Sequence, residues 1–152
     1  MLIRLTTELD APADVVWQAL KRVDTFRFVT RGLMGVAPEG RWPAEFHVGD
    51  VLVGRVWLAH VVPAWMHQIQ LVRLDDARRE IFSRENGGLL RDCTHRLVIE
   101  PCDASRCRYT DEFDVRAGRL TSIAAAIVWA FFHYRQFRWR RLAQTLAKKA
   151  SN

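Results

Sequence analysis

Apolar and polar positions follow two periods along this chain, and the changes of period predict its elements. Residues 2–9, LIRLTTEL, alternate loosely with a period of two, as a half-buried strand does. The next stretch, residues 10–20, predicts a helix, because its early Pro12 is tolerated in a first turn and its apolar residues share one side. A short second helix is expected over residues 26–30. The Gly- and Pro-rich residues 31–45 are expected to form mainly loop, with a brief strand around Leu33 to Val36 as an alternative.

From Val48 onward the period of two returns at hairpin spacing. Turn signals at Pro63-Ala64, Asp75-Asp76-Ala77, Asn86-Gly87-Gly88 and Pro101–Ser105 separate the strands. Five strands are predicted, at residues 51–62, 65–74, 79–85, 89–100 and 106–115. The rest, from residue 120 to about 148, contains no helix breaker and predicts one long helix. The fold class is therefore α+β: a curved antiparallel sheet wrapped around a long C-terminal helix, with two short helices after the first strand.

The long helix is expected to pack on the sheet through one apolar stripe. At about 100° per residue the stripe contains Ile123, Ile127, Phe131, Tyr134, Leu142 and Leu146. Arg135 and Arg138 project near its middle, where each must reach an edge, pair with a carboxylate or contact a ligand, since a buried unpaired charge is costly. Trp129 and Phe132 lie off the stripe, which suggests cover by the short helices or a homodimer contact.

A sheet curved over a helix leaves a cavity wherever the inward side chains do not fill the space. The sequence thus favours intracellular binding of a small hydrophobic ligand, which requires a cavity of roughly 300 Å³ or more. The apolar residues expected to line it are Val56, Leu58, Ile69, Leu71, Leu97, Phe113, Ile127, Phe131 and Tyr134. His95, Arg135 and Arg138 are the polar groups expected to orient the ligand, and Glu85 and Tyr109 are weaker candidates for the wall.

Two neighbouring strands carry a histidine and an aspartate on the side expected to face inward. If the hairpin turns at Pro101–Ser105, Glu100 faces Arg106 and His95 lies opposite Asp111, with the Cβ atoms about 5 Å apart. A carboxylate that orients an imidazole is the geometry of a general base and raises the imidazole pKa. The alternative is a satisfied polar pair within a sheet.

No metal or other cofactor is predicted. His60 and His67 flank Pro63-Ala64 and are expected to be neighbours, but with His95 they follow no metal-binding spacing. The three cysteines show no CxxC spacing, and the N-terminus has no secretory signal. These features indicate a reduced, cytoplasmic protein.

Charge and length leave one further alternative open. The chain has 152 residues and is 49% hydrophobic, which suits one globular domain. Eight Lys or Arg residues and no Asp or Glu follow Asp114, and a peripheral contact of the basic helix with an anionic membrane is the further alternative. The longest weakly polar stretch has 15 residues, short of the roughly 20 that a spanning helix needs. A nucleic-acid partner is not expected, because no binding module is recognisable.

Several stretches also resemble a known group of proteins. The opening IRLTTELDAPADVVWQAL resembles the first strand and helix of the START-like, helix-grip superfamily, and THRLVIEP, YTDEFDVRAGRLT and FFHYRQFRWRRLA resemble its bacterial members. The resemblance implies a single START-like domain over residues 1–152, with a cavity for an apolar or polyaromatic molecule. The superfamily includes lipid-transfer domains and polyketide cyclases and dehydrases. Ligand binding is therefore the preferred function, and a cyclase or dehydratase using His95 as a base steered by Asp111 is the alternative.

Overall fold

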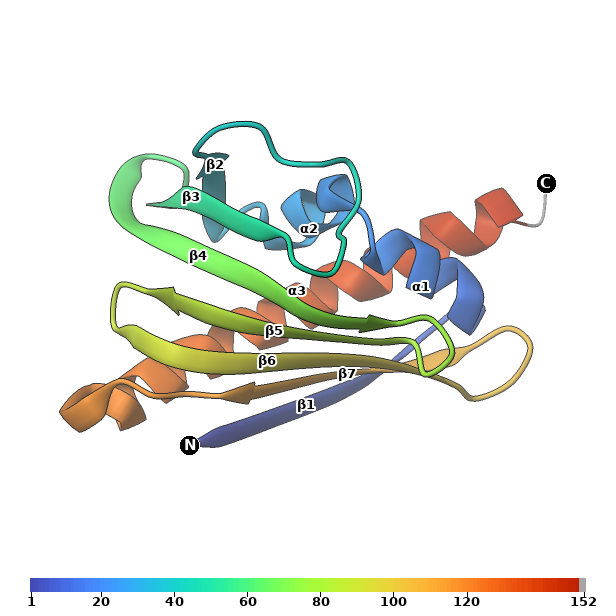
Figure 1. Ribbon diagram of the computed structural model, residues 1–152. Helices are drawn as coiled ribbons and strands as arrows, with labels where there is room; N and C mark the ends of the chain where they lie inside the picture. The colour runs from blue at the N-terminus through green and yellow to red at the C-terminus, as the bar shows by residue number, and fades with distance from the viewer. Residues whose placement is uncertain (151–152) are drawn as a thin grey trace.

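The computed structural model describes residues 1–150 as one antiparallel sheet curled around a long helix (Figure 1). The seven strands are β1 (Leu2–Leu9), β2 (Met34–Pro38), β3 (Val51–Leu58), β4 (Val62–Asp75), β5 (Glu80–Gly87), β6 (Leu90–Pro101) and β7 (Cys107–Asp114). They are arranged in the order β1-β7-β6-β5-β4-β3-β2. The helices are α1 (Ala13–Leu20), α2 (Val23–Thr30), the single 3-10 turn η1 (Gly118–Leu120) and α3 (Thr121–Ala150). The fold class predicted from the sequence is confirmed.

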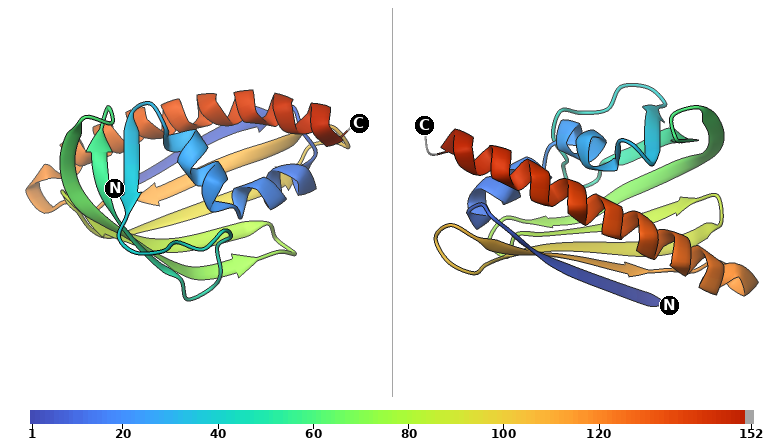
Figure 2. Two further views of the ribbon diagram at one scale, coloured as in Figure 1. Left: turned by 90° about the horizontal axis from the view of Figure 1, so that it is seen from above. Right: turned by 180° about the vertical axis from the view of Figure 1, so that it is seen from behind.

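The helix α3 crosses the concave side of the sheet, and α1 and α2 lie beside its C-terminal half (Figure 2). The helix α1 begins directly after Pro12, whose carbonyl accepts the first helical hydrogen bond, from Val16 N, at 3.1 Å. Its apolar side is buried, with Val16 and Trp17 nearly inaccessible to solvent. The short helices therefore close one end of the space between α3 and the sheet.

The hairpin between β3 and β4 turns earlier than its sequence predicts. Leu58 pairs with Val62, and Ala59 and His60 make the turn with positive φ angles of 48° and 63°. Pro63 and the residue after it therefore belong to β4. Contacts from the two residues before β2 fix the turn: Ala59 N donates to the carbonyl of Leu33, and the ring of His60 accepts from Gly32 N. Such long-range contacts leave no local signal in the sequence.

The register of the β6–β7 hairpin also differs from the prediction. His95 lies opposite Phe113, and Asp111 lies opposite Leu97, so His95 and Asp111 are diagonal neighbours. The chain reverses later than expected because the Asp103 carboxylate accepts hydrogen bonds from the backbone and the hydroxyl of Ser105, both at 2.8 Å. The shift keeps both side chains on the inner face of the sheet, since inward positions stay paired with inward positions.

The face of α3 that packs on the sheet is not the predicted stripe. The buried residues are Ala124, Ala125, Phe132, Arg135, Gln136, Trp139 and Ala143. Ile123 and Ile127 are exposed, while Phe131, Tyr134, Leu142 and Leu146 are half-buried at the margins. The helix is rotated because Arg135 and Gln136 have polar partners inside the protein. Hydrophobic periodicity assigns such residues to the surface.

Candidate functional site

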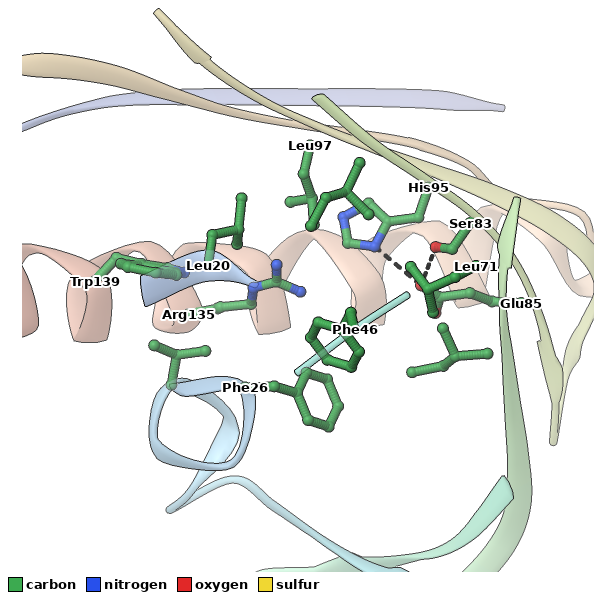
Figure 3. A pocket seen from close by; sticks show the side chains of 13 residues that line it. Leu20, Phe26, Phe46, Leu71, Ser83, Glu85, His95, Leu97, Arg135 and Trp139 are labelled. Carbon is green, nitrogen blue, oxygen red and sulfur yellow. Dashed lines mark hydrogen bonds and ion pairs between the residues drawn. The ribbon is translucent and has the colours of Figure 1, made fainter. Parts of the chain in front are cut away.

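A small cavity lies between α3, α2 and the inner face of the sheet (Figure 3). Its volume is about 50 Å³, whereas pockets for drug-sized ligands measure about 300–1,000 Å³. The expected pocket of a few hundred cubic ångströms is therefore absent between α3 and the sheet in residues 1–150. Its apolar wall consists of Leu20, Phe26, Val29, Phe46, Ile69, Leu71, Ile81 and Leu97, and its polar wall of Ser83, Glu85, His95, Arg135 and Trp139.

Two phenylalanines, which we call the aromatic gate, close the side of the cavity nearest α2. Phe26 comes from α2 and Phe46 from the irregular segment 39–50, and their rings meet edge to face with centroids 6.3 Å apart. Both side chains are half-buried. Figure 3 shows them on the opposite side of the cavity from His95 and Glu85. Of the two gate residues, Phe46 belongs to the irregular segment 39–50 and Phe26 to a helix.

His95 is held between two carboxylates. Its Nδ1 lies 3.0 Å from Glu85 Oε1 and its Nε2 lies 3.1 Å from Asp111 Oδ1, so the expected contact with Asp111 is present despite the different register. Each carboxylate accepts, so both ring nitrogens donate and the ring is an imidazolium. Burial acts to lower the pKa of His95, but the hydrogen bonds to Asp111 and Glu85 outweigh it and raise this pKa above its ordinary value.

Asp111 is completely buried at the centre of this arrangement. Its Oδ1 accepts from the hydroxyl of Tyr109 at 2.9 Å and lies 3.4 Å from Arg135 Nη2, and Gln136 Nε2 donates to its Oδ2 at 3.3 Å. Burial favours the neutral acid, but the charge of Arg135 and the hydrogen bond from His95 hold the pKa of Asp111 below its usual range. The carboxylate thus remains ionised inside the protein.

Glu85 and Tyr109 complete what we call the buried polar network, namely Glu85, His95, Tyr109, Asp111 and Arg135. Glu85 also accepts from Ser83 Oγ at 3.2 Å, and its Oε2 lies 3.1 Å from His67 Nε2. Burial acts to raise the pKa of Glu85, but its contacts with His67 and His95 bring it far below the ordinary value. Burial raises the pKa of Tyr109, so the neutral phenol donates to Asp111 and accepts from Arg135 at 2.7 Å.

Two buried N–H donors in the wall of the cavity have no acceptor among the described residues. They are Arg135 Nε and Trp139 Nε1, one turn apart on α3, and their residues are only 5% and 1% exposed. An unmet buried donor costs about 1–3 kcal/mol. Figure 3 shows Arg135 projecting from α3 into the space between the aromatic gate and His95. Both residues line the cavity, so its wall contains two N–H groups that have no acceptor among the described residues.

Some of the residues predicted to bind ligand meet at this cavity. Ile69, Leu71, Leu97, His95 and Arg135 line it. Glu85, a weak candidate in the sequence, lines it too, while Ser83 and Trp139 are absent from the prediction. The position of Trp139, four residues after Arg135, is the sequence signal that could have identified it, because residues at this spacing share a helix face.

The other predicted lining residues lie elsewhere. Val56, Tyr109 and Phe113 are buried in the core without lining the cavity, and Phe131 and Tyr134 are half-buried. Leu58 and Ile127 were expected to face inward and are instead 40% and 56% exposed. Leu58 ends β3 at the shifted turn, and Ile127 lies on the outer side of the rotated α3.

Arg138 does not enter the cavity. Its Nη2 donates to the carbonyl of Phe28 at 3.0 Å, and its guanidinium lies 4.3 Å from the centre of the Phe28 ring. Of the two arginines expected to project inward, Arg135 is therefore buried and Arg138 reaches the edge. The difference arises because Asp111 and Tyr109 lie below Arg135, whereas α2 lies beside Arg138.

The histidines do not form a cluster of three. His67 pairs with Gly54 in the sheet, far from the β3–β4 turn that contains His60, so the expected proximity of the two is wrong. Within residues 1–150, no group of three or more His, Cys, Asp or Glu side chains is placed to hold a metal ion. Cys93, Cys102 and Cys107 are free thiols.

Comparison with known proteins shows that this chain resembles several solved structures in its fold. No protein-family model matches the sequence, and a search of curated proteins finds no match. A START superfamily protein from Mycobacterium smegmatis has a TM-score of 0.72 at 11% identity, covering 95% of this chain and 98% of that one. Norcoclaurine synthase from Thalictrum flavum, in complex with dopamine and hydroxybenzaldehyde, has 0.68 at 14% identity, covering 95% and 87%. The Zhui aromatase/cyclase from a Streptomyces species has 0.61 at 21%, covering 100% and 96%.

These superpositions extend over nearly the whole chain and define its class as a helix-grip fold. The chain has the START-like fold, as the sequence resemblance predicts. At such identities the likeness concerns the backbone architecture, and one fold supports many activities. The function must therefore be argued from the cavity.

Proposed function

We propose that the protein binds a small, largely apolar molecule in the cavity between α3 and the sheet. The observation that carries this proposal is the pair of unmet donors, Arg135 Nε and Trp139 Nε1, in a wall that is otherwise mainly apolar. A ligand oxygen accepts from these donors, and the apolar remainder of the ligand contacts Leu71, Leu97 and their neighbours. Ligand pockets typically combine apolar walls with a few fixed polar groups in this way.

Binding requires the aromatic gate to open. A cavity of about 50 Å³ has room for a few water molecules, at roughly 10–15 Å³ each, and is too small for a ring system. Phe26 and Phe46 are half-buried, so an outward movement exposes less new apolar surface than moving a core residue. The strands behind the cavity pair along their length and form the fixed side.

Base catalysis by His95 is not part of the proposal. A general base needs a ring nitrogen with a lone pair directed at the substrate, and both nitrogens of His95 donate to carboxylates. Norcoclaurine synthase and the aromatase/cyclase are enzymes with a similar fold, but the polar contacts of this cavity favour holding a molecule over removing its proton.

Filling the cavity is expected to weaken ligand binding. The Leu97→Phe variant should bind 2-acetylnaphthalene at least about tenfold more weakly than the unchanged protein, because the larger side chain occupies the ligand's space. Isothermal titration calorimetry measures both affinities, and circular dichroism establishes that the variant is folded. Leu58→Phe is the matched control, since Leu58 is exposed and lies outside the cavity. Equal losses in both variants, or no binding to the unchanged protein, would overturn the proposal.

A second candidate function, contact with an anionic membrane surface, is favoured by the outer side of α3. Its first half exposes Ile123, Ile127 and Trp129, and its second half exposes Arg140, Arg141, Lys148 and Lys149. No acidic residue follows Asp114, so no carboxylate in α3 neutralises this charge. A bilayer with anionic lipid complements both halves. Within residues 1–150, no helix is both long and apolar enough to span a membrane.

Membrane contact predicts salt-dependent sedimentation with vesicles. The protein should pellet with vesicles of phosphatidylcholine and phosphatidylserine at low ionic strength and be released as the Debye length shrinks to about 3 Å at 1 M salt. Replacing Arg141 and Lys148 with Gln should reduce the bound fraction severalfold. The matched control replaces Arg78 and Arg84, exposed but away from α3, with Gln. Equal losses in the two double variants, or no binding at low salt, would refute a contact through α3.

A further inference from the structure

The buried polar network beside the cavity is balanced in charge. Glu85 and Asp111 each contribute one negative charge, and His95 and Arg135 each contribute one positive charge, so the four groups sum to zero. His67 Nε2 lies 3.1 Å from Glu85 Oε2, and His67 does not line the cavity. Each of the four charged groups already has a partner of opposite charge within 3.4 Å.

We propose that this cavity selects an uncharged ligand that presents an oxygen acceptor, such as a ketone, an alcohol or a phenol, and rejects the corresponding carboxylate. The acceptor lies between Arg135 Nε and Trp139 Nε1, the two unmet donors that belong to residues of the cavity wall. This inference rests on the proposed function, because it names the ligand class of the same cavity.

Arg135 does not make the cavity a site for anions. Its charge is already compensated by Asp111, with Nη2 3.4 Å from Oδ1, and its Nε has no acceptor among the described residues. A carboxylate in the cavity would add one uncompensated negative charge to a site with little access to water, which is costly. Glu85 lines the same wall and would repel it. A neutral oxygen makes the same hydrogen bonds without that cost.

The charges around the cavity also exclude a cationic ligand. Arg135 and His95 line the cavity, and the carboxylates opposite them are committed to Ser83, His67, His95 and Tyr109. An ammonium group in the cavity would face like charges and find no free carboxylate among the lining residues. The charge balance therefore selects against both signs.

The test compares two probes of nearly the same shape, 2-acetylnaphthalene and 2-naphthoate, by calorimetry at pH 7. The ketone is expected to bind about 100-fold more tightly than the carboxylate. Trp139→Phe should weaken the ketone severalfold by removing one donor while keeping an aromatic side chain. Equal affinities, or tighter binding of the carboxylate, would overturn the inference and leave the proposed function standing. If neither probe binds, the proposed function itself fails.

The Glu85→Gln variant tests the charge balance directly. Removing one negative charge gives the network a net charge of +1, so the affinity for 2-naphthoate should rise at least about tenfold while that for the ketone changes little. If the variant does not fold, Ser83→Ala, which leaves every charge in place, is compared with the unchanged protein and should retain the preference for the ketone. An unchanged discrimination in folded Glu85→Gln, or its loss in Ser83→Ala, would contradict the role of charge.

Discussion

Replacing Asp111 with Asn is expected to lower the free energy of unfolding by about 3–5 kcal/mol. The substitution removes the negative charge that compensates Arg135 and His95, both of which are buried beside it. Breaking a buried ion pair by removing one partner leaves an uncompensated charge, and the amide cannot accept from all the donors that now surround the carboxylate. Urea unfolding monitored by circular dichroism measures the change.

The control is Asp10→Asn, the same chemical change at an exposed position. It should alter the free energy of unfolding by less than about 0.5 kcal/mol, as surface substitutions generally do. A loss below about 1 kcal/mol in Asp111→Asn would show that the buried polar network does not depend on this carboxylate.

Phe132→Ala is expected to cost about 3–5 kcal/mol, the usual range for truncating a buried aromatic side chain. Phe132 is 3% exposed, and its ring stacks on His95 with a centroid distance of 4.9 Å and meets the Phe113 ring at 5.5 Å. Truncation leaves a space beside the imidazolium as well as in the apolar core. Urea unfolding measures the lost stability as a lower midpoint concentration at an unchanged m-value.

Phe137→Ala is the matched control, because Phe137 is on the same helix and is 45% exposed. It should cost less than about 1 kcal/mol, and so should Ile127→Ala on the outer side. This comparison decides which face of α3 packs on the sheet. If Ile127→Ala proved as destabilising as Phe132→Ala, the stripe predicted from the sequence would be right and the observed face wrong.

The two stability predictions concern residues that also support the cavity. Asp111 holds Arg135 by charge, and Phe132 lies 5.5 Å below the Arg135 guanidinium. Arg135 Nε can offer its hydrogen to a ligand only while its other nitrogens are held in place. The interactions that stabilise the interior therefore also orient the donor on which the proposed function depends.

Local patterns of apolar and polar residues predicted the order of strands and helices along the chain. The period of two in LIRLTTEL and in the strands after Val48 reports side chains that alternate between core and solvent. The unbroken helix-compatible stretch after Gly118 likewise predicted α3. Such patterns need no knowledge of distant residues, so the fold class followed from the sequence. They also placed His95 and Asp111 on the inner face of neighbouring strands.

Three features of the structure differ from the prediction. The β3–β4 turn is fixed by residues near Gly32, and the β6–β7 register by the hydrogen bonds of Asp103. The rotation of α3 depends on Asp111, which offers Arg135 and Gln136 partners inside the protein. A periodicity argument weighs each side chain by its own polarity and cannot include a partner that the fold supplies.

The sequence by itself thus determined the order of strands and helices, the inward position of His95 and Asp111, and the concentration of positive charge after Asp114. The tertiary structure alone decided that His95 is shared by Glu85 and Asp111, that Arg135 is buried while Arg138 is not, and that the cavity is small and closed. The physical reason is that a buried charge or an unmet donor is defined by every group around it. Those groups here come from β5, β6, β7 and α3, which are brought together only by folding.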